Sequence, residues 1–176
     1  MRKVILGIGL LAAASLALVG TAVADHDEDG RVRASLDGYQ EVVGPGSIST
    51  IGRGRFTAEI HQQRIDYRLT YTLENPATQA HIHFAERHVG GGVSAFLCGG
   101  GSKPPCPPGV GAEATVTGTI TAADVIGPAN QGIEPGSFAE LVRAIRAGAT
   151  YVNVHSTRWP AGEIRGQIGG GDDDDD

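Results

Sequence analysis

Two histidines one residue apart, His81 and His83, are the side chains whose type and spacing most directly suggest chemistry. They alternate with Ala80, Ile82 and Phe84, and such alternation predicts an extended strand with one face buried. Both imidazoles would then project from the polar face, about 6.5 to 7 Å apart along the strand. A single metal ion can bridge that distance, so the pair is a candidate set of metal ligands.

A third histidine, His155, ends a second alternating segment, in which Val152 and Val154 supply the apolar face. If the two segments are neighbours in one sheet, three imidazoles converge on the same side. Three imidazoles with an open coordination position suit Cu(II) or Zn(II), and His88 or Glu163 could complete the shell. The sequence does not fix a cofactor, and a copper or zinc ion is the candidate that these residues suggest.

The same histidines have a second interpretation, which the sequence leaves open. They could form a half-buried polar network, hydrogen-bonded to one another, to Arg165 and to Asn153. Nucleophilic catalysis beside His155 is not favoured, because Ser156 would point to the opposite strand face and no Gly-x-Ser-x-Gly elbow occurs. No catalytic residue is predicted, and a non-enzymatic protein is favoured.

The N-terminal segment has the layout of a signal peptide. Arg2 and Lys3 precede an apolar run over residues 4–19, and small residues occupy positions 22–24. The run is short for a membrane span, so residues 1–24 are predicted to be a signal peptide cleaved after Ala24. The mature protein would be secreted or extracytoplasmic, in the periplasm or at the cell exterior, and would keep no membrane span.

The two cysteines fit such a compartment. Cys98 and Cys106 lie in a stretch rich in Gly and Pro, and an oxidising environment predicts a disulfide between them. Closing a loop this short contributes about 2 to 3 kcal/mol in the loop-entropy model. The disulfide is therefore expected to fix a loop, and the hydrophobic core is expected to hold the fold together.

The balance of charge argues against a nucleic-acid partner. Cleavage after Ala24 would remove two positive charges, so the formal net charge of −6 would become −8, and Lys103 would be the single lysine left. Nucleic-acid binding relies on clustered Lys and Arg that release counterions. Residues 25–31 are predicted to be a polar leader, and residues 169–176, with their run of aspartates, a disordered Gly/Asp tail.

Residues 32–168 contain a series of short alternating segments, which predicts a β-sandwich domain. The expected strands cover residues 32–36, 56–61, 65–73, 80–84, 93–97, 114–120, 151–155 and 163–168. One helix is expected from Phe138 to Ile145, with Ser137 and Glu140 spaced as a capping box and Gly148 as its C-terminal cap. The predicted fold class is all-β, an antiparallel sandwich with one short α-helix, whose strands follow one another as a meander.

Four stretches together resemble the CHRD domain, the repeated unit named after chordin. They are residues 81–83 (His-Ile-His), 118–124 (Gly-Thr-Ile-Thr-Ala-Ala-Asp), 151–155 (Tyr-Val-Asn-Val-His) and 162–167 (Gly-Glu-Ile-Arg-Gly-Gln). The resemblance covers roughly residues 32–168. It implies an immunoglobulin-like β-barrel that is distantly similar to copper-zinc superoxide dismutase, and it implies no general activity.

The resemblance sharpens the metal hypothesis and weakens the enzymatic one. Copper-zinc superoxide dismutase likewise has a His-x-His strand, but its further ligands, including a bridging histidine and an aspartate, find no full counterpart here. The expected function is that of a secreted, non-enzymatic binding module for an unidentified protein or matrix partner. The alternative is a copper- or zinc-binding protein that could carry out superoxide-dismutase-like chemistry.

Overall fold

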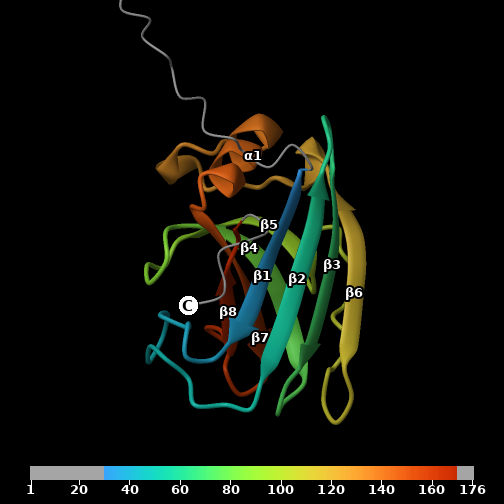
Figure 1. Cartoon of the computed structure of the whole chain (residues 1–176), viewed down its shortest axis with the longest axis vertical. Helices are drawn as coiled ribbons and strands as arrows, with labels where there is room; N and C mark the ends of the chain where they lie inside the picture. The colour runs from blue at the N-terminus through green and yellow to red at the C-terminus, as the bar shows by residue number, and fades with distance from the viewer. Residues whose placement is uncertain (1–29, 170–176) are drawn as a thin grey trace, which may run out of the picture.

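The computed structural model describes residues 30–169, which form eight β-strands, one α-helix and two short 3-10 helices (Figure 1). The strands are β1 (Arg31–Asp37), β2 (Arg53–Ile60), β3 (Ile65–Thr72), β4 (Ala77–Phe84), β5 (Gly92–Cys98), β6 (Ala114–Ile120), β7 (Thr150–Ser156) and β8 (Ile164–Gln167). The helices are η1 (Ala122–Asp124), η2 (Ala129–Gln131) and α1 (Phe138–Arg146). The predicted signal peptide, residues 25–29 of the leader and residues 170–176 of the tail lie outside the described residues.

All eight strands belong to one sheet, in the order β5-β4-β7-β8-β1-β2-β3-β6. The sheet folds into two layers, with β1, β2, β3 and β6 side by side in front in Figure 1 and the other four strands behind. At the fold, β1 and β8 share the pair Asp37–Arg165, and an isolated bridge joins Arg33 to Gly169. The predicted all-β, sandwich-like fold with a single short α-helix is confirmed.

Sheet order departs from chain order after the third strand, so the expected simple meander is wrong from that point. β1, β2 and β3 do pair consecutively, and His61 donates its backbone N–H to the Arg64 carbonyl (2.8 Å) in the turn between β2 and β3. β4, however, pairs with β5 on one side and with β7 on the other. This long-range pairing places the two strands that carry the candidate histidines next to each other.

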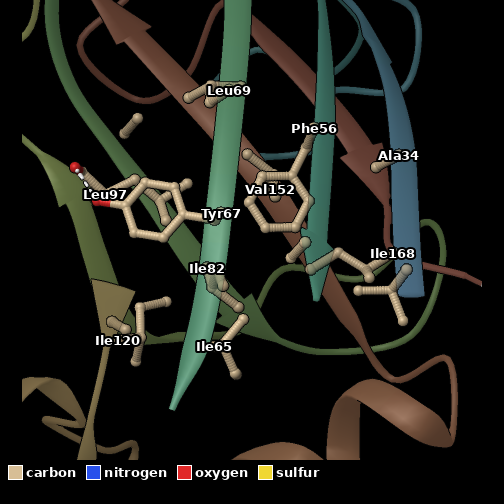
Figure 2. Close-up of a cluster of buried hydrophobic side chains, with 14 of the residues drawn as sticks. Ala34, Phe56, Ile65, Tyr67, Leu69, Ile82, Leu97, Ile120, Val152 and Ile168 are labelled. Carbon is tan, nitrogen blue, oxygen red and sulfur yellow. Dashed lines mark hydrogen bonds between the residues drawn. The ribbon is translucent and has the colours of Figure 1, made fainter. Parts of the chain in front are cut away.

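The core lies between the two layers, where the inward-facing side chains of alternate strand positions meet (Figure 2). Phe56 and Leu69 from the front layer and Ile82 and Val152 from the rear layer are all almost fully buried. Burying each side chain of this size contributes about 1.5 to 3 kcal/mol. The apolar face of the histidine strands is therefore anchored, and the opposite face of β4 and β7 must point outward.

A buried tyrosine ties the front layer to the rear layer. The hydroxyl of Tyr67 on β3 donates a hydrogen bond to the carbonyl of Leu97 on β5, at 2.7 Å (Figure 2). Burial raises the pKa of Tyr67 to about 12, so the hydroxyl keeps its proton and stays a donor. The bond satisfies a polar group that would otherwise be stranded in the core.

Helix α1 covers one end of the sandwich (Figure 1). Its buried residues are Leu141, Val142, Ala144 and Ile145. The expected capping box is wrong: Ser137 precedes the helix, but its side chain makes no capping hydrogen bond, and Glu140 pairs with Arg143. Gly148, with φ of 67°, stands just beyond the helix in the left-handed conformation expected of a glycine that ends a helix.

The predicted disulfide is confirmed and fixes a loop. Cys98, the last residue of β5, is bonded to Cys106, and their Cα atoms lie 5.0 Å apart. Within the loop, Gly99 donates its backbone N–H to the carbonyl of Pro104 at 2.8 Å. None of the helices within residues 30–169 has the length and hydropathy of a membrane span.

Candidate metal centre

Three histidines from two neighbouring strands meet on the outer face of the rear layer. β4 carries His81 and His83, and β7 carries His155. In the β4–β7 register Asn153 lies opposite His81 and Gln79 lies opposite His155, so His155 is the diagonal neighbour of His81. One nitrogen from each of the three rings lies within 4.8 Å of the others. The structure therefore brings together the three residues that the sequence proposed as main ligands.

His81 is the central ring of this cluster. Its centroid is 5.3 Å from that of His83 and 4.7 Å from that of His155, in edge-to-face arrangements. The ring of Phe96 on β5 packs edge-on at 4.6 Å and forms an apolar wall. The β4–β5 ladder shifts register immediately before each of the two β4 histidines, an irregularity that changes the direction of a side chain.

All three imidazoles are buried, although they lie outside the hydrophobic core. The exposed fractions of His81, His83 and His155 are 4%, 9% and 9%. Burial, aided by the neighbouring imidazoles, lowers the pKa of His81 to about 3 and that of His83 to about 4. Burial also lowers the pKa of His155. At neutral pH the rings are uncharged, which is the state that a metal ion requires.

Backbone carbonyls determine which nitrogen carries the proton in two of the rings. Nδ1 of His83 lies 2.9 Å from the carbonyl oxygen of Gly91, and Nδ1 of His155 lies 2.9 Å from that of Pro160. A carbonyl oxygen can only accept, so each Nδ1 is the donor and each Nε2 keeps a free lone pair. Histidines that bind metals commonly donate their second ring nitrogen to a carbonyl in this way.

The remaining ring nitrogens have no hydrogen-bond partner within residues 30–169. They are Nε2 of His83, Nε2 of His155 and both nitrogens of His81. Buried polar atoms are normally paired, so each exception needs an explanation. Here several unpaired acceptors converge on one small region, which is the arrangement of a ligand set for a cation.

The alternative polar network is not formed at the rings. Asn153 donates its amide N–H to the carboxylate of Glu41, and Arg165 donates to the backbone carbonyl of Glu86 at 3.0 Å. Among the described residues, no hydrogen bond joins one of the three imidazoles to Asn153, to Arg165 or to another imidazole. Asn153 and Arg165 therefore lie on the same sheet face as the histidines but form no hydrogen bond with their rings.

The two residues considered as additional ligands lie apart from the cluster. His88 is exposed in the turn after β4, with φ of 66°. Glu163 is fully buried just before β8, where its Oε1 accepts a hydrogen bond from the Thr50 hydroxyl at 2.8 Å. Neither belongs to the group of side chains that could hold one ion.

Tyr151 lies between a cluster histidine and a buried arginine. Its ring stacks on that of His83, with centroids 4.7 Å apart and planes within 4° of parallel. The guanidinium carbon of Arg165 lies 3.5 Å from the centre of the same ring. The sheet order β4-β7-β8 puts these partners on opposite sides of Tyr151. Tyr151 shares a strand face with His155, but its stacking on His83 depends on cross-strand register, which the sequence pattern does not reveal.

The loop between β1 and β2 reaches over this face through Glu41. The Glu41 side chain is fully buried and accepts hydrogen bonds from the backbone N–H groups of Val42 (2.9 Å) and Val43 (3.2 Å) and from the amide of Asn153. Burial raises the pKa of Glu41, and these hydrogen bonds oppose that effect. No signal in the sequence marked Glu41, because an isolated loop carboxylate gives no indication of what it will contact.

Of three comparisons with known proteins, one finds a match, and it is to a domain family. The family model described as "CHRD domain" matches residues 32–168, which is most of the chain and nearly all of the described part. No curated protein and no solved structure matches.

Proposed function

The chain belongs to the CHRD domain family, and from that premise we propose that it is a non-enzymatic, extracytoplasmic binding module whose ligand is one copper or zinc ion. The ion would be held by His81, His83 and His155. One observation carries the proposal: three buried, neutral imidazoles present unpartnered nitrogens within 4.8 Å of one another.

The donor set indicates the class of metal. Imidazole nitrogen suits copper and zinc, and at equal availability the general order of stability favours Cu(II) over Zn(II). Three protein ligands leave one coordination position for an exogenous ligand. When bound, the metal would supply Lewis-acid chemistry and, if it is copper, one-electron chemistry. The carbonyls of Gly91 and Pro160 orient the rings of His83 and His155, and the burial of all three rings excludes bulk water.

An extracytoplasmic location is supported by two features. The Cys98–Cys106 disulfide is typical of an oxidising compartment. The predicted signal peptide over residues 1–24 provides the route of export. A module in that location could alternatively serve a protein or matrix partner, and such a function would not require metal.

The test is the metal content of the exported, mature chain. After removal of metal with EDTA, the protein is equilibrated with Cu(II) or Zn(II) and analysed for bound metal. We expect one ion per chain and a higher melting temperature, because a ligand that binds only the folded state stabilises it. Combining His81→Ala with His83→Ala should abolish both effects.

His61→Ala combined with His88→Ala is the matched control. Both of these histidines lie outside the cluster, so this variant should keep one ion per chain. Circular dichroism checks that each variant is folded. Failure of the unmodified chain to bind metal, or equal loss in the two double variants, would overturn the proposal and leave a protein or matrix partner as the function.

A further inference from the structure

We propose that Asn153 makes the open coordination position of this centre selective for a ligand that carries a proton, such as water, over an aprotic anion such as azide. The inference rests on the proposed function, since it concerns the fourth ligand of the metal. It names the chemical class of that ligand and the residue that selects it.

Asn153 lies beside two of the three ligands. It is the residue opposite His81 in the β4–β7 ladder, and it precedes His155 by two residues on the same face of β7. Side chains that are directly opposite each other have Cβ atoms about 4.5 to 5.5 Å apart. The side chain is 2% exposed, so its amide is in contact with the protein interior of this face and not with bulk solvent.

The orientation of the amide is set by Glu41. Nδ2 of Asn153 donates to Oε2 of Glu41, whose other oxygen accepts two backbone N–H groups. A carboxylate only accepts, so the nitrogen of the amide must face it. The carbonyl oxygen, on the other branch of the planar amide, therefore points away from Glu41.

Glu41 meets the Asn153 amide beside Gly162, in the turn that joins β7 to β8. Its carboxylate passes over Gly162, where an added Cβ would overlap both the Glu41 carboxylate and the Asn153 amide nitrogen. Gly162 precedes β8, and β8 and β4 flank β7 on opposite sides. With Nδ2 placed at Glu41 and Gly162, Oδ1 is the free branch of the amide, on the residue that lies opposite His81 in the β4–β7 ladder.

This carbonyl oxygen is an unsatisfied acceptor. Oδ1 of Asn153 is buried and receives no hydrogen bond from any group within residues 30–169. A ligand with an O–H or N–H group at the open position can donate to it. Azide has no proton to donate, so its negative charge would face the oxygen lone pairs and Oδ1 would remain unpaired. The geometry thus favours protic ligands.

Azide titration of the Cu(II)-loaded protein tests the inference. Binding is followed by the charge-transfer absorption of the azide complex, and the bound water is followed by water-proton relaxation. Asn153→Leu keeps the approximate size of the side chain and removes the acceptor. We expect azide to bind about 3- to 10-fold more tightly to this variant, the effect of about one hydrogen bond, and the relaxation enhancement by bound water to fall. Asn153→Ala serves the same purpose if the leucine variant does not load copper.

Gln79→Leu is the matched control. Gln79 lies opposite His155 on the same outer face, but its amide donates to the Gly99 carbonyl at 3.3 Å. Its replacement should leave azide affinity within about twofold of the unmodified chain, because its carbonyl oxygen, unlike Oδ1 of Asn153, is not a buried acceptor without a partner. An equal gain in the Gln79 and Asn153 variants would overturn the inference.

The failures are distinguishable. If the unmodified chain holds no copper, the proposed function is wrong and the inference falls with it. If all variants hold one copper ion and Asn153→Leu leaves azide affinity unchanged, only the role of Asn153 is wrong.

Discussion

The imidazole of His83 lies flat against the phenol ring of Tyr151, with ring centres 4.7 Å apart and planes within 4° of parallel. The guanidinium of Arg165 covers the other side of the phenol ring, at 3.5 Å from its centre. His83 therefore has two restraints, a hydrogen bond from Nδ1 to the Gly91 carbonyl and a rigid aromatic surface. A ring held in this way keeps Nε2 directed at the same point.

Replacing Tyr151 should therefore change metal affinity mainly through loss of the ring, because the hydroxyl makes one long hydrogen bond, accepted from the Gly91 N–H at 3.3 Å. We expect Tyr151→Leu to weaken copper binding about 10-fold, the lower end of the range for residues that orient a metal ligand. Tyr151→Phe keeps the stacking surface and should stay within about twofold of the unmodified chain. Competition with a chromophoric chelator measures both affinities. A loss in the phenylalanine variant as large as in the leucine variant would show that stacking is not what positions His83.

The metal-free protein should lose stability as the pH falls from about 6.5 toward 4. The folded-state pKa values of His81 and His83 are lowered, to about 3 and about 4, from an ordinary value of 6.5. The unfolded chain then binds more protons than the folded chain in this window, so the free energy of unfolding rises with pH and is highest, for these groups, above about 6.5.

The contribution of one histidine is isolated by comparing denaturant unfolding of the unmodified chain and His81→Gln between pH 4 and 7. Between about pH 4 and 6 the difference between the two curves should have a slope approaching one proton, about 1.4 kcal/mol per pH unit, and the slope should fall toward zero above about pH 6.5. Glu41 has a raised pKa, which makes the free energy of unfolding change with pH in the opposite direction. Because both proteins contain Glu41, its effect cancels in the difference. Parallel curves would contradict the assignment of a neutral, buried His81.

Gly162 should tolerate no side chain. Its φ is 135°, and a Cβ there would overlap the Glu41 carboxylate and the Asn153 amide. Gly46, with φ of 98°, has nothing within 4 Å of an added Cβ. Alanine at either position carries backbone strain of about 1 to 3 kcal/mol, but only Gly162→Ala adds a steric conflict. Thermal and denaturant unfolding should show a greater loss for Gly162→Ala, and equal losses would mean that Glu41 can withdraw freely.

Removing the disulfide should lower stability without removing the metal centre. Combining Cys98→Ser with Cys106→Ser should cost about 2 to 3 kcal/mol, from the loop entropy of a short cross-link. The cluster histidines lie on β4 and β7, and neither strand carries a cysteine. Metal stoichiometry is therefore expected to stay at one ion per chain in this variant. Unfolding curves and elemental analysis measure the two quantities on the same preparation.

Local sequence patterns predicted most of the elements that carry the centre. Alternation placed His81 and His83 on one strand face and His155 on the polar face of another strand, and the structure has both strands, as β4 and β7. The same reasoning was wrong for the capping box at Ser137 and for the meander order of the strands. The capping hydrogen bond and the order of strands in the sheet both depend on contacts in the folded chain. The spacing of two residues and the order of strands along the chain do not predict those contacts.

The sequence by itself determined which side chains share a strand face, because side-chain direction alternates with a period of two that depends only on the local backbone. It also indicated the CHRD family, the disulfide and the single helix. Only the tertiary structure decided that β4 lies beside β7, that carbonyls of Gly91 and Pro160 hold two of the rings, and that Glu41 reaches Asn153. These contacts join segments far apart in the chain, so they depend on the packing of the whole sandwich and not on any local pattern.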